Sequence, residues 1–276
     1  MDDPAATARD KIGQLPTMDG SDTSWLQVVK RADRGSTILV CLPHAGGTVL
    51  SAAKLAHAVS SRFEVLVTEL PGRRPGDKRP TPRRAIPVGA RLANELATYV
   101  AEDGAGRRLV LLGNSYGALL AFETALSLLS GHSDRLDEAH LQVIVSGFRS
   151  PSLPPSDSPL YRLPTDDLRT ELLHRFDLSP AELDTAGLVD IEPSLRADLE
   201  ACDTYRPRRG ITLPCQVDVL NLTRDASVSL TELLAWQQVA TRPIRRRDID
   251  GGHFPWTSRA AAVAEAVSSL VNEAPA

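Results

Sequence analysis

The sequence predicts an α/β fold in which helices cover both faces of a mostly parallel sheet. Short apolar runs alternate with helical patterns of ten or more residues, an order typical of strands joined by crossover helices. One run passes into a long helix through a glycine-flanked serine, Ser115, and the alternation breaks once, over residues 149–205. A chain of 276 residues is long enough for one such domain with a helical insertion.

The elements are expected in the following order. Residues 1–22 are polar and aperiodic and are interpreted as a flexible leader. Two apolar runs, 25–29 and 37–42, flank a polar turn and should pair as a hairpin. Further strands are expected at 63–70, 107–112, 141–146, 216–222 and 243–249. Amphipathic patterns predict helices at 50–60, 88–101, 116–129, 230–240 and 258–273. The core of the domain therefore comprises residues 23–148 and 206–276.

The insertion, residues 149–205, has a different composition. Five prolines between Pro151 and Pro164 fit neither a central strand nor the interior of a helix. Three helical segments follow, at 166–175, 180–188 and 193–205. Thr165 is expected to cap the first of them. Because the insertion follows the strand at 141–146, it should lie above the carboxyl ends of the parallel strands and act as a lid.

Composition excludes several classes of protein. The formal net charge of −4 gives no reason to expect nucleic acid or a membrane as partner. Cys41, Cys202 and Cys215 are odd in number and have no paired spacing, so neither a disulfide framework nor a metal site is indicated. No stretch approaches the ~20 apolar residues of a membrane span. The first residues lack the pattern of a signal peptide, and we expect a soluble, cytoplasmic protein.

The serine lies in Gly113-Asn114-Ser115-Tyr116-Gly117, between an expected strand and an expected helix. A sharp turn of this kind forces the serine into a strained backbone conformation, and the glycines leave room for it. The start of the helix adds partial positive charge where an oxyanion would form. The pattern is typical of the nucleophile elbow of an α/β-hydrolase. The alternative is a glycine-rich turn with a capping serine.

A serine nucleophile needs a base, and a histidine base needs a carboxylate to fix its tautomer. In this fold the order is serine, acid, histidine, and each group lies on a loop just past a strand. Asp225 follows the strand at 216–222, and His253 follows the last strand. We therefore predict Ser115 as nucleophile, Asp225 as acid and His253 as base.

Other residues compete for these roles. Asp250 precedes His253 by three residues and is expected to order that loop, while Asp218 lies inside its strand. His44, in a tight Pro-His-Ala-Gly-Gly turn, is expected to be a hydrogen-bonded loop residue. The alternative for His253 is a loop histidine without chemistry.

Two backbone N–H groups are expected to form an oxyanion hole. One belongs to Tyr116, directly after the nucleophile, and the other comes from the loop after an earlier strand. Ala45 is the candidate there, because Gly46 and Gly47 let the backbone approach a substrate closely. The alternative is a glycine-rich turn before a helix and nothing more.

Several segments occur together in the order seen in one family. They are Leu42-Pro43-His44-Ala45-Gly46-Gly47-Thr48, Glu69-Leu70-Pro71-Gly72-Arg73, Gly113-x-Ser115-x-Gly117-Ala118, Leu195-Arg196-Ala197-Asp198-Leu199 with Tyr205, and Gly251-Gly252-His253-Phe254. From about residue 39 to 254 the chain resembles type II thioesterases. These are stand-alone α/β-hydrolases that serve polyketide synthases and nonribosomal peptide synthetases.

The resemblance implies hydrolysis of acyl thioesters on the phosphopantetheine arm of acyl or peptidyl carrier proteins, with no metal and no diffusible cofactor. By matching position it assigns the triad and the oxyanion donors to the same five residues. Asn114 and Tyr116 depart from the family's usual neighbours of the nucleophile, and Asp225 lacks a preceding glycine. The phenol of Tyr116 is expected to narrow or polarise the acyl pocket, which indicates a specialised substrate.

Three alternative functions keep the same fold. In the first, an internal nucleophile or another acceptor resolves the acyl-enzyme and releases a cyclised or transferred product. In the second, a non-enzymatic pseudo-hydrolase binds acyl carriers without turnover, although the intact serine–acid–histidine order argues against it. An ordinary small-ester hydrolase is compatible with the fold alone.

Residues 71–87 form a loop dense in proline and arginine. Against the single Asp77 it carries the basic residues Arg73, Arg74, Lys78, Arg79, Arg83 and Arg84. The loop follows the strand that ends at Leu70, so it should emerge on the same rim as Ser115. Because the resemblance implies an acidic carrier protein, we expect the five arginines to dock it. The alternative is a solvated loop.

Overall fold

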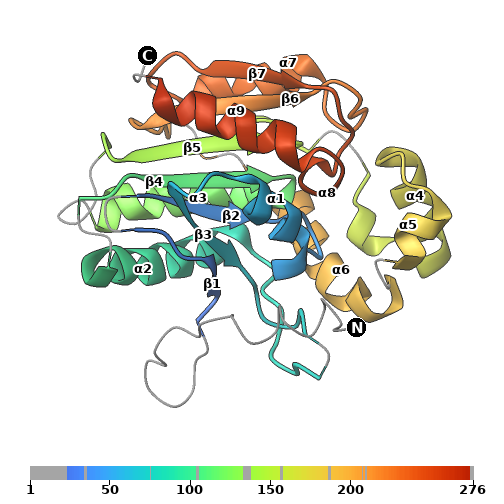
Figure 1. The fold of residues 1–276 in the computed structure, drawn as a ribbon. Coiled ribbons are helices and arrows are strands. Elements are labelled where there is room, and N and C mark those ends of the chain that lie inside the picture. Colours follow the sequence, from blue (N-terminus) through green and yellow to red (C-terminus); the bar gives the residue numbers. More distant parts are fainter. Residues whose placement is uncertain are drawn as a thin grey trace, which may run out of the picture.

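The computed structural model describes residues 24–273 apart from 34–35, 75, 104–105, 133–137, 156–157, 186–187, 207 and 209. The expected leader, residues 1–22, lies outside the described residues. Within them the strands form one sheet in the order β1-β3-β2-β4-β5-β6-β7 (Figure 1). The strands are β1 Leu26–Lys30, β2 Thr37–Leu42, β3 Phe63–Thr68, β4 Leu109–Asn114, β5 Leu141–Ser146, β6 Gln216–Leu222 and β7 Arg245–Ile249.

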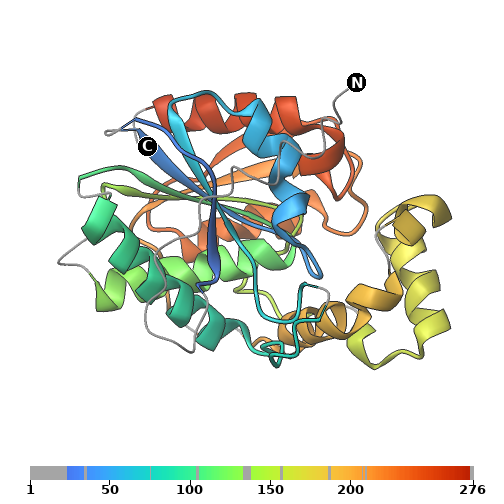
Figure 2. The ribbon, with the colours of Figure 1, turned by 60° about the horizontal axis from the view of Figure 1, so that its bottom comes forward.

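Helices cover both faces of this sheet, as Figure 2 shows. One face carries α2 Ala85–Asp103, α3 Tyr116–Gly131, α7 Leu230–Leu234 and the 3-10 helix η4 Ala235–Val239. The other carries η2 Val49–Ala52, α1 Ala53–Ala58, α8 Pro255–Ser258 and α9 Ala260–Asn272. Because both faces are covered, every residue of β3, β4 and β5 is buried. The predicted fold class, an α/β-hydrolase with a mostly parallel sheet, is confirmed.

The expected hairpin of the first two strands is wrong. β2 lies between β3 and β4 and is parallel to both, so neither of its edges is left for β1. β1 pairs antiparallel with the outer edge of β3 instead, with Leu26 opposite Thr68. The crossover through α1 returns β3 to the side of β2, and the first strand takes the next edge.

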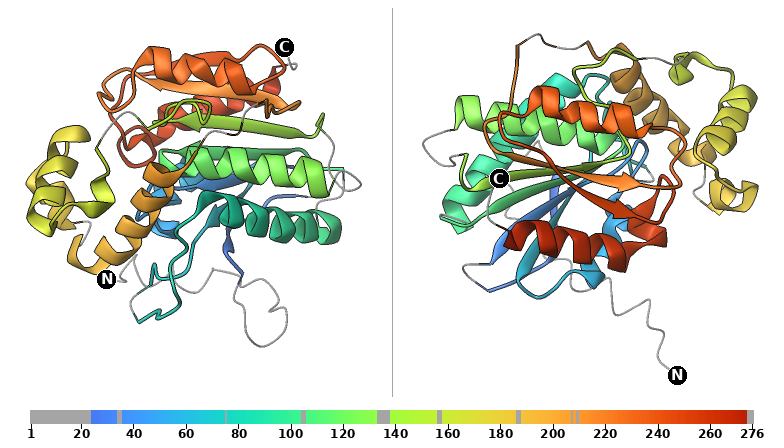
Figure 3. Two further views of the ribbon diagram at one scale, coloured as in Figure 1. Left: turned by 180° about the vertical axis from the view of Figure 1, so that it is seen from behind. Right: turned by 90° about the horizontal axis from the view of Figure 1, so that it is seen from above.

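The residues after β5 form a separate group of helices beyond the carboxyl ends of the strands (Figure 1, Figure 3). They are η3 Leu160–Arg162, α4 Thr165–Arg175, α5 Pro180–Thr185 and α6 Leu188–Thr204. Their side chains share a small core formed by Leu160, Leu168, Leu172, Leu183, Leu195 and Leu199.

Two details of this insertion differ from the expectation. Thr165 does not cap α4, because it is the first residue of the helix and its hydroxyl donates to Glu192 at 2.9 Å. α6 begins at Leu188, so Pro193 lies inside the helix and does not start it. The expected strands and helices of the core end within three residues of the observed ends.

Candidate active site

Ser115 lies at the turn from β4 into α3, with φ of 56° and ψ of −123°. Among the described non-glycine residues only Ser115 and Asp177 have a positive φ, so this is the strained turn expected of a nucleophile elbow. Close packing requires both glycines. A Cβ on Gly113 would lie 2.3 Å from the Gly117 carbonyl oxygen, and one on Gly117 would lie 1.8 Å from that of Leu42. The elbow therefore packs directly against the end of β2.

Three side chains from distant parts of the sequence meet at this turn. His253 Nε2 lies 2.9 Å from Ser115 Oγ, and His253 Nδ1 lies 2.8 Å from Asp225 Oδ2. Asp225 follows β6 and His253 follows β7, so neighbouring parallel strands deliver both groups to the same edge of the sheet. The structure thus brings together the three residues that the chain order indicated.

Hydrogen bonds around Asp225 favour its charged form. Burial would raise the pKa of this carboxyl, but the bonds from His253 and Ser227 outweigh burial and hold the pKa below its usual value. Ser227 donates to Asp225 Oδ1 from its hydroxyl, at 2.6 Å, and from its backbone N–H, at 3.0 Å. Its Oγ also lies 3.0 Å from His253 Nδ1. Sequence reasoning missed Ser227, although a serine two residues after an aspartate is a common turn arrangement.

The loop after β2 carries Ala45, the second predicted oxyanion donor. Ala45 and Ser115 both line one cavity of the structure. Neither the Ala45 N–H nor the Tyr116 N–H donates a hydrogen bond within the described chain. Gly46 has a φ of 73°, which a glycine adopts without strain. Its N–H is already used, because it donates to Asp198 Oδ2 at 2.8 Å. The N–H groups of Ala45 and Tyr116 therefore have no partner among the described residues, and their role as oxyanion donors stays a prediction.

Comparison with known proteins places this site in a family. Residues 37–271 match the family model of the thioesterase domain. Thioesterase PikA5 from Streptomyces venezuelae is 32% identical over 238 residues, which span 83% of this chain and 79% of that protein. This chain belongs to the thioesterase family.

Solved structures share the architecture of this thioesterase. The type II thioesterase BorB from the borrelidin biosynthetic cluster matches with a TM-score of 0.75 at 26% identity, over 91% of this chain and 99% of that one. YbtT, the type II thioesterase from the Yersiniabactin NRPS/PKS biosynthetic pathway, matches with a TM-score of 0.73 at 26% identity, over 89% and 97%.

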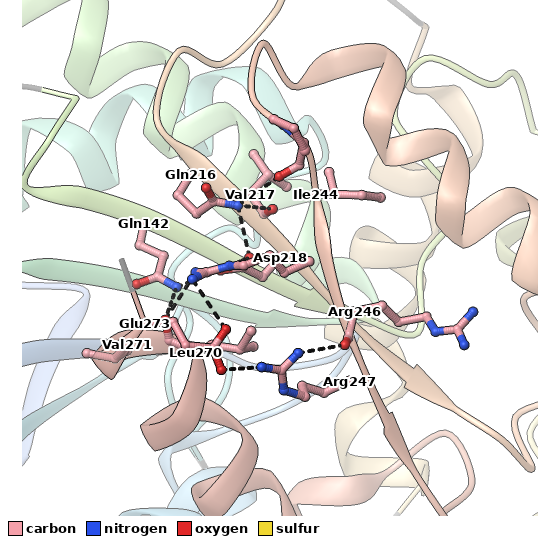
Figure 4. Close-up of polar contacts among 12 residues, drawn as sticks. Gln142, Gln216, Val217, Asp218, Ile244, Arg246, Arg247, Leu270, Val271 and Glu273 are labelled. Atoms are coloured by element: carbon pink, nitrogen blue, oxygen red, sulfur yellow. Dashed lines mark hydrogen bonds and ion pairs between the residues drawn. The ribbon is translucent and has the colours of Figure 1, made fainter. Parts of the chain in front are cut away.

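The other candidate acids of the thioesterase face elsewhere. Asp218 is fully buried near the amino end of β6, where the Arg245 guanidinium donates to its two oxygens at 2.7 and 2.8 Å. Two glutamine amides complete this cluster, with N···O distances of 2.6 and 3.0 Å (Figure 4). Asp250 has a side chain 75% exposed and pairs with Arg224 at 2.8 Å. Asp225 is therefore the acid that contacts His253.

His44 lines the cavity but is held within its own turn. Its Nδ1 lies 2.9 Å from the Ala45 carbonyl oxygen, and its ring packs edge-on against Phe254 with centroids 4.8 Å apart. Burial lowers the pKa of His44 to about 4, and the nearby charges of His253 and Arg73 act in the same direction against the Ala45 bond. The imidazole is therefore neutral near pH 7, and the expectation of a hydrogen-bonded loop residue is confirmed.

Both unusual neighbours of the nucleophile are buried. Asn114 Nδ2 donates to the His253 carbonyl at 3.0 Å, and Asn114 Oδ1 accepts from Ser146 Oγ at 2.7 Å. Asn114 thus ties the histidine loop to β5. The Tyr116 side chain is 1% exposed and is not among the groups that line the cavity. The phenol therefore does not narrow the acyl pocket, and that half of the expectation is wrong.

A cavity of about 870 Å³ opens at Ser115. The insertion supplies its apolar wall, which includes Leu172, Phe176, Leu183, Ile191, Leu195 and Leu199. The Phe176 ring lies over the His253 ring with centroids 4.3 Å apart. Leu50, Lys54 and Thr257, which lie outside the insertion, also line the cavity. The wall suits an apolar group attached to the carbonyl that Ser115 would attack.

Residues 71–87, here called the basic loop, carry arginines that mostly pair with carboxylates of the same chain. Arg73 is wrong as a docking residue, because its side chain is 2% exposed and pairs with Asp198 at 2.5 Å. The other pairs are Arg74 with Glu69, Arg79 with Asp77 and Arg83 with Glu200. Arg84 is exposed. Of the described residues in this loop, none lines the cavity.

The described residues contain neither a cluster of metal ligands nor a membrane-spanning helix. No group of three or more His, Cys, Asp or Glu side chains in that part of the chain is placed to hold a metal ion. No helix there combines the length and apolarity needed to cross a membrane.

Proposed function

We propose that this thioesterase hydrolyses acyl thioesters through an acyl-enzyme on Ser115. Ser115 Oγ attacks the thioester carbonyl while His253 Nε2 takes its proton, and Asp225 holds the imidazole in the required tautomer. The N–H groups of Ala45 and Tyr116 bind the oxyanion. The imidazolium returns the proton to the departing thiolate. Water then resolves the ester by the same steps, without a metal or a diffusible cofactor.

One observation carries this proposal. The bonds from Ser115 to His253 and from His253 to Asp225, 2.9 and 2.8 Å long, have the geometry that proton transfer requires. They end at a cavity whose wall is apolar. The same observation argues against a pseudo-hydrolase that only binds acyl groups.

The names of the relatives support a substrate class. BorB and YbtT are type II thioesterases of biosynthetic pathways, the second of an NRPS/PKS pathway. We propose that this chain is a type II thioesterase of the same kind, which removes acyl groups from the phosphopantetheine arm of acyl or peptidyl carrier proteins. The apolar wall of the cavity favours apolar acyl chains over charged ones.

The insertion, residues 149–205, is proposed to act as a lid over Ser115. Its helices share a small leucine core and contribute much of the cavity wall. The carboxyl half of α6 is tied to the main domain, since Asp198 binds Gly46 and the Tyr205 hydroxyl donates to Glu123 at 2.7 Å. The mobile part of the lid is therefore proposed to be α4 and α5.

A carrier protein is proposed to contact the basic loop through Arg74, Arg79, Arg83 and Arg84. The first three are paired within the chain, yet their side chains remain 57%, 39% and 59% exposed. Opposite charge on a partner would raise the association rate more than the affinity.

The test is a product analysis in water labelled with oxygen-18. Octanoyl groups are offered on a carrier protein and on N-acetylcysteamine. We expect free octanoic acid with one labelled oxygen from the wild-type protein and none from Ser115→Ala. Transfer to another acceptor, or turnover by Ser115→Ala, would overturn the proposal. Because octanoate carries no internal nucleophile, a hydroxyacyl thioester is run in parallel to reveal cyclisation.

A further inference from the structure

Asp198, on α6, is a buried carboxylate that contacts the loop after β2. Its Oδ2 accepts hydrogen bonds from the Gly46 N–H, at 2.8 Å, and from Arg73 Nη2, at 2.5 Å. The side chains of Asp198 and Arg73 are 0% and 2% exposed. A helix that lines the cavity and the loop that carries the Ala45 N–H are thus joined through one oxygen atom.

Several polar atoms of this ion pair lack a hydrogen-bond partner. Within the described chain, Asp198 Oδ1 and Arg73 Nε and Nη1 are buried without a hydrogen-bond partner. At the Asp218–Arg245 pair, by contrast, each carboxylate oxygen accepts from the guanidinium and from an amide. Moving charges out of water is unfavourable, and a half-bonded pair offsets little of that cost. Stability alone therefore does not explain the position of Asp198.

Hydrogen bonds hold both peptide planes around Ala45. The His44 carbonyl accepts from the Gly47 N–H at 2.9 Å, which holds the plane that contains the Ala45 N–H. In the next plane the Ala45 carbonyl lies 2.9 Å from His44 Nδ1, and the Gly46 N–H faces Asp198. Because Gly46 tolerates many φ values, this plane depends on its hydrogen bonds. Asp198 supplies the one on the N–H side, from outside the loop.

The other oxyanion residue neighbours the same pair. Burial raises the pKa of the Tyr116 phenol well above its usual value, the charge of Asp198 adds to that rise, and Arg73 opposes it. The Tyr116 side chain is therefore near enough to Asp198 and Arg73 to be influenced by their charges, while the loop after β2 is bonded to Asp198 directly.

We propose that Asp198, held by Arg73, is a positioning residue that sets the oxyanion hole and links it to the acyl chain. Leu195 and Leu199 line the cavity next to Asp198 on α6, and a Cβ added to Gly46 would lie 3.5 Å from Leu195 Cβ. An acyl chain packed against these leucines would hold α6 in place. Through Asp198, α6 would then hold the loop after β2. The inference rests on the proposed function, and it makes acyl length act on kcat as well as on KM.

Two double variants isolate the bond to Gly46. Arg73→Met with Asp198→Asn removes both charges and leaves an amide oxygen that accepts from the Gly46 N–H. Arg73→Met with Asp198→Leu removes the same charges at similar size and leaves no acceptor. We expect kcat for octanoyl thioester to be about 100-fold lower in the leucine variant than in the asparagine variant, the loss typical of a misplaced oxyanion donor. KM should differ by less than about threefold.

A reversible inhibitor gives a readout that a merely structural role would not move. Ser115 Oγ adds to the carbonyl of an alkyl trifluoromethyl ketone, its proton passes to His253, and the carbonyl oxygen becomes an oxyanion. The affinity for this ketone should fall in parallel with kcat, while an alkyl thioether of the same length should bind both variants equally. Asp218→Asn is a control that disturbs another ion pair, near the other end of the sheet, and should leave the ketone affinity unchanged.

Equal kcat and equal ketone affinity in the two double variants would overturn the proposal, as would the same loss in Asp218→Asn. If the double variants do not fold, Leu195→Ala tests the link, because its kcat for octanoyl thioester should fall toward that for acetyl thioester. An unchanged ratio of the two kcat values would also overturn it. Wild-type protein that binds the ketone but hydrolyses no thioester would contradict the proposed function and not the role of Asp198.

Discussion

Two aspartates near opposite ends of β6 show how a structural carboxylate differs from a catalytic one. Asp218, near the amino end, is fully buried and bonded to Arg245 and two glutamine amides. Asp225, just past the carboxyl end, is also buried and bonded, but its partners are Ser227 and His253. Burial and a full set of hydrogen bonds are common to both. The difference is that His253 continues to Ser115 and the cavity, whereas Arg245 leads to no reactive group.

Replacing each aspartate by asparagine should give the largest contrast, between a loss of kcat and a loss of stability. Asp225→Asn should lower kcat about 10³- to 10⁴-fold, because the imidazole loses its tautomer, with little loss of stability. Asp218→Asn should keep kcat but lower the free energy of unfolding by about 2 kcal/mol, since the half-buried Arg245 loses its charged hydrogen-bond partner. Steady-state kinetics and urea unfolding measure both. The reverse pattern, or a large kcat loss in Asp250→Asn, would show that the acid is wrongly assigned.

The strand that carries Asp218 and the insertion helices α4 and α5 should also differ in mobility. Near Asp218 the chain is held by strand pairing and a closed polar cluster, whereas α4 and α5 pack on η3 and α6 through the small leucine core of the insertion. Amide hydrogen exchange should therefore be at least about tenfold faster in α4 and α5 than in β6 and in the carboxyl half of α6. Equal protection of α4 and β6 would argue against a mobile lid.

His44, which lines the cavity, makes stability depend on pH. The pKa of His44 is lowered from 6.5 to about 4, so the unfolded chain takes up a proton in this range before the folded one. Stability from neutral His44 is complete above pH 6.5 and is lost as pH falls toward 4. His44→Gln should therefore lose less stability over this window than the wild-type protein. If the free energy of unfolding fell equally with pH in the wild-type protein and in His44→Gln, this account of His44 would be contradicted.

The smallest effect is expected at the exposed charges. Arg83→Glu with Arg84→Glu should raise KM for an octanoyl carrier protein about three- to tenfold at low salt, and less at high salt. KM for octanoyl-N-acetylcysteamine should not change. Arg62→Glu with Arg246→Glu changes the charge by the same amount at two exposed arginines that do not line the cavity, and serves as the control. An equal rise on both substrates would mean that the loop shapes the active site.

Much of this site follows from local pattern and chain order. Periodicity located the strands, and the rule that each catalytic loop follows a strand then identified Asp225 and His253. Arg73 was misjudged because a run of charge indicates solvent, whereas its burial depends on Asp198, which lies on a different element. The predicted pairing of β1 with β2 was wrong for the same reason. Whether an edge of β2 is available to β1 depends on where β3 and β4 lie.

The bonds of Ser227 show a further limit. A serine near an acid is ordinary in any loop, and only the folded structure reveals that its hydroxyl reaches both Asp225 and His253. Likewise the motif residues Gly46, Arg73 and Asp198 stand out in the sequence, yet their spacing contains no information that they touch. Contacts between distant segments depend on tertiary packing.

The most direct test of the account is to trap the covalent intermediate. Wild-type protein is mixed with octanoyl carrier protein, quenched in acid within milliseconds and digested, and the peptides are weighed by mass spectrometry. We predict that an octanoyl group appears on Ser115 and decays as octanoic acid forms. Ser115→Ala should show no acyl group and a kcat at least about 10⁴-fold lower. Octanoic acid release at the wild-type rate by Ser115→Ala, or an acyl group on another residue, would contradict the mechanism.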